Sequence, residues 1–154
     1  MTTIAATLKE IAADTRVSWE GVGNDTYKSV KLYKTKYGLY GITGENCDGS
    51  ITAIGWFMDG GIRPEPPKKA DWRILELGET GLAIYNTYLE RDSILDNCIS
   101  LGSGRKVALY CMKVLGMSPA EAVREACKAD SWSGLPIYSA TLADKQIIKI
   151  TKWR

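Results

Sequence analysis

The chain begins Met1-Thr2-Thr3, and a threonine that becomes the first residue carries two groups for nucleophilic chemistry. Its hydroxyl can attack a carbonyl carbon while its own α-amine, with a pKa of about 8, accepts the proton. The sequence contains no histidine, which excludes Ser-His-Asp and Cys-His nucleophile pairs and His-ligated metal sites. An N-terminal amine that serves its own threonine needs no imidazole. A threonine of this opening that became the first residue would therefore be a candidate nucleophile with its own base.

The four cysteines, Cys47, Cys98, Cys111 and Cys127, are a second set of reactive residue types. They are scattered along the chain and form no CxxC pair. This spacing is typical of neither a zinc knuckle nor a disulfide framework. We expect them to be reduced and mostly buried.

Composition and charge narrow the class of protein. A chain of 154 residues with 45% apolar and 25% charged residues is most simply one globular domain, covering 1–154. The net charge of +2 gives no argument for nucleic acid or an anionic membrane as a partner. No apolar run approaches the roughly 20 residues of a membrane span, and no signal peptide is recognisable, so a cytoplasmic protein is predicted.

Alternation of apolar and polar residues predicts strands through most of the chain. In the first half the expected strands are Thr3–Leu8, Ile11–Asp14, Val17–Trp19, Thr26–Tyr33 and Tyr37–Thr43. A short helix at Asp48–Asp59 and a proline-rich loop, RPEPPKK, follow. Further strands are expected at Trp72–Leu77, Leu82–Tyr88, Asn97–Leu101, Ile137–Leu142 and Gln146–Thr151.

Two adjacent helices are predicted between the last strands. Arg105–Leu115 places on one stripe the side chains of Val107, Ala108, Cys111, Met112 and Leu115. Pro119–Ala129 begins with an N-cap serine, Ser118, and a glutamate, Glu121, three residues later. Its inward-facing residues are expected to be Ala120, Val123 and Cys127. The order of the elements predicts two antiparallel sheets with helices outside them.

Several segments, read in chain order, resemble one family. They are the opening Thr-Thr-Ile, then IAADTRV, GITGENCD, ISLGSGRKVAL and KADSWSGLPI. Together they resemble the proteasome β-subunit and HslV family of N-terminal-nucleophile (Ntn) hydrolases, over nearly the whole chain. The resemblance implies an α+β fold, a four-layer αββα sandwich in which helices flank two antiparallel sheets. It also implies a threonine endopeptidase without a cofactor, whose nucleophile is Thr2.

The resemblance assigns roles to charged residues near Thr2. An ammonium close to the α-amine would lower the pKa of that amine and polarise the hydroxyl. The matching lysine is Lys31 in the segment SVKLY, with Lys28 as the alternative. Asp14 in AADTRV matches the carboxylate that holds this lysine, and Arg16, two residues on, is expected to support it.

Further site residues are implied in the same way. Gly44 in GITGEN matches the backbone N–H that stabilises the oxyanion. Ser103 between two glycines, and Asp130 and Ser133 in the segment DSWSG, match residues that hydrogen-bond around the amine. The register also places near the nucleophile three candidate substrate-pocket residues: Val17, Ile42 and Asn46. A medium-sized apolar side chain before the cleaved bond is expected.

The chain departs from the family pattern after Gly44. The family usually has two long helices there, whereas this chain has room for one short helix and the RPEPPKK loop, as in compact bacterial and phage relatives. The expected substrate is a peptide or unfolded protein, and the expected assembly is a homo-oligomer. The chain carries no P-loop, so any ATP-driven step would need a separate ATPase partner.

Each of these residues also has a purely structural interpretation. Asp14 could end a strand, Gly102-Ser103-Gly104 could begin a helix, and Ser133-Gly134 could form a turn. Two other functions stay open. One is a catalytically inactive structural or assembly subunit, for instance in a viral particle, which a retained Met1 would favour. The other is an amidase that acts on a small non-peptide amide.

Overall fold

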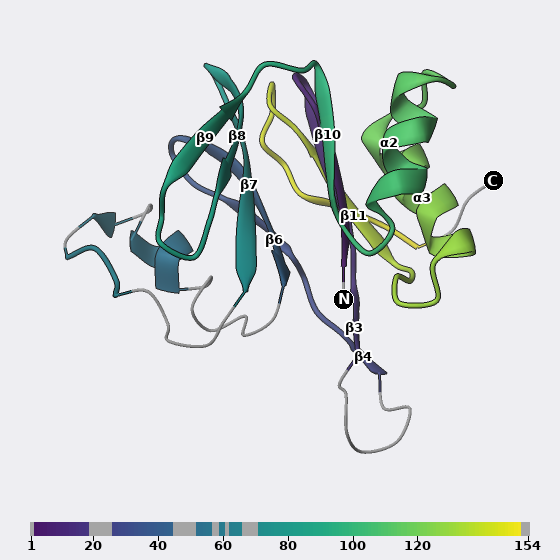
Figure 1. Cartoon of the computed structure of the whole chain (residues 1–154), viewed down its shortest axis with the longest axis horizontal. Coiled ribbons are helices and arrows are strands. Elements are labelled where there is room, and N and C mark those ends of the chain that lie inside the picture. Colours follow the sequence, from purple (N-terminus) through teal and green to yellow (C-terminus); the bar gives the residue numbers. More distant parts are fainter. Residues whose placement is uncertain are drawn as a thin grey trace.

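Two antiparallel sheets lie face to face, and a pair of helices covers the outer face of one of them (Figure 1). The computed structural model describes residues 2–18, 26–44, 52–56, 59–60, 62–65 and 71–151. Within these residues each large sheet has five strands, and a two-stranded ribbon extends from the end at which the chain begins. No helix of this described part is long and apolar enough to cross a membrane.

The first sheet contains the beginning of the chain at its centre. Its strand order is β10-β1-β2-β11-β12. The strands are β1 (Thr3–Thr7), β2 (Glu10–Asp14), β10 (Cys98–Gly102), β11 (Ile137–Thr141) and β12 (Ile148–Ile150). β10 pairs with β1 on the side away from β2, so that Thr3 lies opposite Gly102. The start of β1 is therefore flanked by a strand end on each side.

The second sheet has the order β5-β6-β7-β8-β9. Its strands are β5 (Leu32–Lys34), β6 (Gly38–Gly44), β7 (Trp72–Gly78), β8 (Gly81–Tyr85) and β9 (Arg91–Ile94). The ribbon consists of β3 (Arg16–Ser18) and β4 (Thr26–Lys28). It links the end of β2 in the first sheet to β5 in the second.

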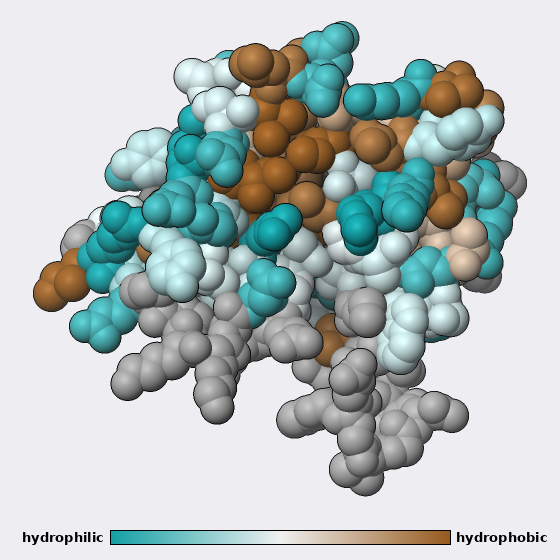
Figure 2. All heavy atoms as spheres, in the orientation of Figure 1, coloured by the Kyte–Doolittle hydropathy of each residue, from teal (hydrophilic) through white to brown (hydrophobic). Residues whose placement is uncertain are grey.

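The strands bury one apolar face of each sheet against the other. The cluster between the sheets joins Ile4, Ile11 and Leu101 of the first sheet to Leu39 and Leu75 of the second. In Figure 2, apolar side chains reach the surface in the upper middle of the view, where Figure 1 shows the upper parts of the two sheets. Burial of this shared core supplies the main driving force for holding the two sheets together.

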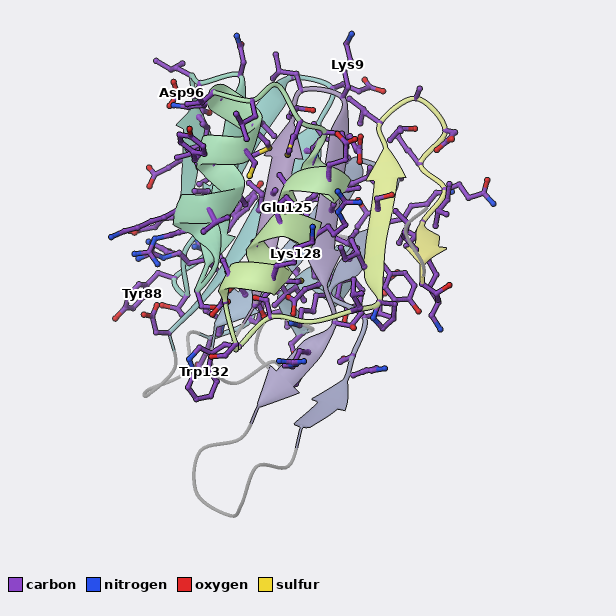
Figure 3. The ribbon with its side chains drawn as sticks, turned by 90° about the vertical axis from the view of Figure 1, so that its right-hand side faces the viewer. Lys9, Tyr88, Asp96, Glu125, Lys128 and Trp132 are labelled. Atoms are coloured by element: carbon purple, nitrogen blue, oxygen red, sulfur yellow. The ribbon has the colours of Figure 1, made fainter. Side chains whose placement is uncertain are left out.

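Two helices, α2 (Arg105–Lys113) and α3 (Pro119–Ala129), pack against the other face of the first sheet. The contact is made largely of small residues: Ala5, Ala12, Ala108, Ala122 and Ala126. Because the side chain of alanine is a single methyl group, the helices lie close to the sheet. The opposite face of α3 is charged, and Figure 3 shows Glu125 and Lys128 on it, where they form an ion pair at 2.8 Å.

The outer face of the second sheet is covered by much less helix. Residues 52–56 are helical, and Ala53 and Ile54 pack there against Ile42, Trp72 and neighbouring side chains. The two-sheet sandwich expected from the sequence is thus present. The helical layer is extensive on the first sheet and short on the second, within the described residues.

Some expected boundaries are wrong, each for a local reason. The single strand Thr26–Tyr33 is divided between β4 and β5, because residues 29–31 cross from the ribbon to the second sheet. There the Ser29 N–H donates to the Thr15 carbonyl at 2.9 Å. The strand expected to reach Tyr88 ends at Tyr85, because the side chain of Asn86 accepts the Tyr88 N–H at 2.9 Å and begins a turn.

Other expectations differ in extent. The sequence analysis missed β9, whose residues RDSI lack an apolar alternation. Leu115, expected on the buried stripe of its helix, lies beyond α2 and is exposed, whereas Ala108, Cys111 and Met112 are buried. The last strand begins at Ile148 because Asp144 accepts the Gln146 N–H at 2.8 Å in the preceding turn.

The start of α3 offers a test of local sequence signals. The Ser118 hydroxyl accepts the Glu121 N–H at 3.3 Å, and the Glu121 carboxylate accepts the Ser118 N–H at 2.9 Å. Replacing Ser118 with alanine should lower the free energy of unfolding in urea by about 1 kcal/mol. The control Ser131→Ala changes an exposed side chain and should stay within about 0.5 kcal/mol of the parent protein. Equal losses in both variants would contradict a role for the cap.

Candidate active site

The candidate residues converge at one end of the sandwich, where β1 begins. Asp14 ends β2, Ser103 follows β10, and Asp130 and Ser133 follow α3. The chain from the ribbon to the second sheet brings Lys31 to the same place. Figure 1 shows the start of the chain and the turn that follows α3 at this lower end. Segments distant in sequence therefore build one site.

The carboxylate of Asp14 is the best-connected group of this site. It is fully buried. Its Oδ1 accepts the Thr3 N–H and the Lys31 ammonium, both at 2.9 Å. Its Oδ2 accepts the N–H groups of Arg16 and Gly134, both at 3.0 Å. These charge-assisted hydrogen bonds compensate the cost of removing the carboxylate from water.

Lys31 is the lysine that lies at the site, and Lys28 is exposed. The Lys31 side chain is 8% exposed, and its ammonium also donates to the Arg16 carbonyl at 2.6 Å. The strand change between β4 and β5 makes this possible, because it turns residue 31 toward the end of β2. The ammonium is therefore held in a fixed position beside the start of β1.

Thr2 is 5% exposed and is held by the turn after β10. Its carbonyl accepts the Ser103 N–H at 2.8 Å and lies 3.4 Å from the Ser103 hydroxyl oxygen. Gly102 has φ 93°, and a Cβ there would lie 1.7 Å from the Thr2 oxygen. Only glycine fits this approach, so the Gly-Ser turn is shaped around the Thr2 backbone.

A chain of hydroxyl groups links this turn to the segment after α3. Asp130 Oδ2 accepts the hydroxyls of Ser103 at 2.5 Å and Ser133 at 2.7 Å. The Ser133 oxygen lies 2.6 Å from the Thr3 hydroxyl, and that hydroxyl accepts the Gly104 N–H at 3.1 Å. The expected serines and aspartate thus meet, and their described contacts are to the Thr2 carbonyl and the Thr3 hydroxyl.

These hydrogen bonds set the charge state of Asp130. Burial raises the pKa of its carboxyl group, but the hydroxyls of Ser103 and Ser133 and the Trp132 N–H lower it by more. The pKa of Asp130 is therefore below its ordinary value. Figure 3 shows Trp132 beyond the end of α3, on the turn that carries this aspartate. The group is a carboxylate acceptor at neutral pH.

Arg16 joins two parts of the site. Its guanidinium donates to the Ser131 carbonyl at 2.6 Å, and its main chain contacts both Asp14 and Lys31. The Thr15 hydroxyl donates to the Pro136 carbonyl at 2.8 Å. Side chains of residues 15 and 16 therefore fix the position of the segment after α3.

Gly44 ends β6 on the second sheet and has φ 116°. A Cβ at this position would lie 2.2 Å from the Asp71 carbonyl, so no other residue fits without movement. Gly44 lines a cavity of about 370 Å³ between the two sheets' ends. The other lining residues are Thr43, Asp71, Arg73, Leu101, Gly102 and Arg105. The Thr43 hydroxyl would lie 3.3 Å from a Cβ at Gly102, so the cavity reaches the turn that contacts Thr2.

The three expected substrate-pocket residues have different surroundings. Val17 is half-buried in the ribbon strand β3. Ile42 is buried on the outer face of the second sheet with Ala53, Ile54 and Trp72. Asn46 lies outside the described residues. The structure thus does not bring Val17 and Ile42 into one described cluster, and their role in binding substrate stays a prediction.

The cysteines have different surroundings. Cys98, Cys111 and Cys127 form no disulfide, and Cys47 lies outside the described residues. Burial, followed by the nearby Asp14 carboxylate, raises the pKa of the Cys127 thiol to about 12. Among the described residues, no three His, Cys, Asp or Glu side chains are placed to hold a metal ion.

Three contributors to the candidate site were not predicted from the sequence. Thr3 provides a hydroxyl that contacts Ser133, and Gly134 provides an N–H to Asp14. Gly102 makes room for the Thr2 carbonyl. A signal for Thr3 was present, because neighbouring residues of a strand point to opposite faces and a second threonine would face the helices. Backbone donors such as the Gly134 N–H have no side-chain signature.

We expect removal of the Asp14 carboxylate to lower the stability of the fold strongly. Asp14→Ala would leave the Lys31 ammonium buried without its carboxylate and would remove the acceptor of three N–H groups. The free energy of unfolding should fall by about 3–5 kcal/mol in urea denaturation. The matched control is Asp96→Ala, which removes an exposed pair with Lys113 at 3.8 Å and should cost about 0.5 kcal/mol or less. A small, equal change in both would show that the buried pair is unimportant.

Because the pKa of Asp130 is lowered in the folded protein, we expect the stability of the fold to depend on pH in the acid range. Because this pKa is lowered in the folded protein, the carboxylate stabilises the fold above the unfolded value of about 3.9. That contribution is lost as the pH falls through the folded value. Ser103→Ala removes one donor, so ¹³C NMR titration should show a higher pKa for Asp130 and a shallower loss of stability in acid. Ser93→Ala, far from the site, should leave the titration unchanged, and a pKa unaffected by Ser103→Ala would refute the stated cause.

Comparison with known proteins gives no match by sequence: no protein-family model and no curated protein matches the chain. Solved structures do match. HslV from Trypanosoma brucei superposes with a TM-score of 0.68 at 14% identity, over 90% of this chain and 98% of that chain. BPH from Thiobacillus denitrificans has a TM-score of 0.65 at 17% identity, over 97% and 98%. That protein has also been solved in complex with epoxomicin, with a TM-score of 0.59 at 14% identity, over 98% and 99%.

A further similar structure is a Gly-1 mutant of Anbu from Hyphomicrobium sp. strain MC1, with a TM-score of 0.67 at 12% identity, over 98% of this chain and 88% of that chain. HslV is one of the two protein groups that the sequence segments resemble. The likenesses cover almost the whole chain and show a shared fold. The chain therefore has the proteasome-like two-sheet fold.

Proposed function

We propose that this chain is a threonine-type endopeptidase that cleaves peptides or unfolded protein with Thr2 as its nucleophile. One observation carries the proposal: the start of β1 is held between a buried Lys31–Asp14 ion pair and the Ser103–Asp130 turn. An ion pair buried at the edge of a core costs stability unless it is fully hydrogen-bonded. Its position beside a small hydroxyl residue is what a nucleophile with an amine base requires.

The first step uses groups of Thr2 alone. After removal of Met1, the free α-amine accepts the proton of the Thr2 hydroxyl while the oxygen attacks the peptide carbonyl. The tetrahedral intermediate carries a negative oxygen, and we assign the backbone N–H of Gly44 to stabilise it. The carbon–nitrogen bond then breaks. The protonated amine of Thr2 returns its proton to the leaving amine, which departs as a new N-terminus.

The second step regenerates the enzyme. The acyl group is now bound to the Thr2 oxygen as an ester. A water molecule attacks this ester and gives a proton to the α-amine, and the same oxyanion donor stabilises the second intermediate. Breaking the ester bond releases a carboxylic acid, and the proton returns to the Thr2 oxygen.

The remaining residues position these groups. The Lys31 ammonium lowers the pKa of a nearby amine by repulsion and stabilises negative charge on the threonine oxygen. Asp14 keeps that ammonium charged and fixed. Ser103 holds the Thr2 carbonyl at 2.8 Å through its N–H, and Asp130 orients the Ser103 hydroxyl. Such fixed geometry avoids reorganisation at the moment of reaction.

An epoxyketone tests the proposal directly, and epoxomicin, the ligand of the structurally similar BPH, is such a compound. Its two electrophilic carbons react with the hydroxyl and the free α-amine of one N-terminal threonine. The untagged protein should lose the mass of one methionine and then gain the mass of one epoxomicin molecule. Thr2→Ala should gain no adduct because it lacks the hydroxyl, and Thr2→Ser should still react.

The matched control is Thr80→Ala, an exposed turn residue, which should be labelled like the parent protein. Intact-mass spectrometry and N-terminal sequencing read out all four proteins. A retained Met1 with no adduct would refute the peptidase and favour a structural or assembly subunit. Labelling with no cleavage of any peptide, but with cleavage of small amides, would favour an amidase.

A further inference from the structure

The described residues that line the cavity beside the Gly-Ser turn carry more positive than negative charge. They include two arginines, Arg73 and Arg105, and one carboxylate, Asp71. Within the described residues, neither arginine forms an ion pair, since the pairs there join Lys31, Arg91, Lys113, Arg124 and Lys128 to acidic partners. Two guanidinium groups without a carboxylate partner in a concave site favour a negatively charged occupant.

The two arginines come from opposite halves of the sandwich. Arg73 is the second residue of β7, opposite Thr43 on β6. Arg105 begins α2, immediately after the turn that holds Thr2, and its guanidinium donates to the Gly102 carbonyl at 3.1 Å. That contact fixes the direction of the Arg105 side chain along the cavity wall. A ligand between them would contact both halves of the sandwich.

The cavity lies on a defined side of Thr2. β1 is flanked by β2, which carries Asp14 and leads to Val17, and by β10, which ends at Gly102. Val17, one of the residues expected to contact the residue before the cleaved bond, lies beyond the end of β2. The cavity is on the β10 side, with Gly44 on its wall. A peptide whose residue before the cleaved bond lies beside Val17, and which crosses Thr2 toward β10, directs its next residue into the cavity.

We propose that this cavity binds an acidic side chain, aspartate or glutamate, of the residue that follows the cleaved bond. The inference rests on the proposed function, because it names the substrate class of that same site. A carboxylate placed between two guanidinium groups makes charge-assisted hydrogen bonds of the kind that Arg forms well. The volume of about 370 Å³ is ample for one side chain.

Asp71 limits the size of the preference. Its carboxylate lies in the same wall and repels an acidic ligand, while the exposed arginines are partly screened by water and salt. We expect a preference of about tenfold for glutamate over glutamine, which corresponds to about 1.4 kcal/mol. The preference should shrink as the salt concentration rises.

Two octapeptides that differ at one position test this. Each has leucine before the expected cleavage point and alanine elsewhere, with glutamate in one and glutamine in the other after the cleavage point. The ratio of kcat/KM for the two peptides should be about ten in the parent protein. It should fall toward one in Arg73→Gln and rise in Asp71→Asn. The matched control is Lys106→Gln, which removes the same charge one residue from Arg105 but outside the cavity lining.

A binding measurement separates this inference from the proposed function. Fluorescence anisotropy with labelled versions of both peptides is measured on Thr2→Ala, which cannot cleave them. We expect Thr2→Ala to bind the glutamate peptide about tenfold more tightly than the glutamine peptide. We expect this difference to disappear in the double variant Thr2→Ala/Arg73→Gln. That result would support acidic recognition by the cavity even if epoxomicin does not label the parent protein and the parent protein cleaves no peptide. Equal binding and equal kcat/KM in a protein that epoxomicin labels would overturn the cavity assignment and leave the peptidase intact. Equal binding in an unlabelled, inactive protein would overturn both.

Discussion

One buried carboxylate determines how the site is assembled. Asp14 receives hydrogen bonds from the main chain of Thr3, Arg16 and Gly134 and from the ammonium of Lys31. Each donor belongs to a different segment, so the carboxylate fixes their relative positions. An uncompensated charge in the same place would destabilise the fold by several kcal/mol. The fold and the candidate site therefore depend on the same atoms, so a substitution of Asp14 changes both the stability of the fold and the geometry of the site.

Local signals predicted the parts of the fold that depend on local interactions. The bounds of α3 match the prediction because Ser118 and Pro119 act within the first helical turn. The expected strand Thr26–Tyr33 is wrong because a long-range contact decides it: Lys31 meets Asp14, 17 residues earlier. Polar β9 was missed because it pairs at the edge of a sheet, where burial imposes no alternation.

The meeting of the charged and hydroxyl-bearing candidates was predictable from the sequence, whereas most of their main-chain contacts were not. Residues identified by resemblance meet as charged or hydroxyl partners, for example Lys31 with Asp14 and Ser103 with Asp130. The cavity was not foreseen, because its arginines are 32 residues apart in sequence and come together only through the pairing of the sheets. Main-chain donors such as the Gly134 N–H have no signature of their own in the sequence, since every residue except proline has an N–H.

The order of the segments has a consequence for biosynthesis. Asp14, which holds the start of β1, receives one of its hydrogen bonds from Gly134, a residue 120 positions later in the chain. A growing chain in which Gly134 is still inside the ribosome lacks this donor. The surroundings of Thr2 therefore become complete only after almost all of the strands and both helices that pack on the first sheet have been synthesised.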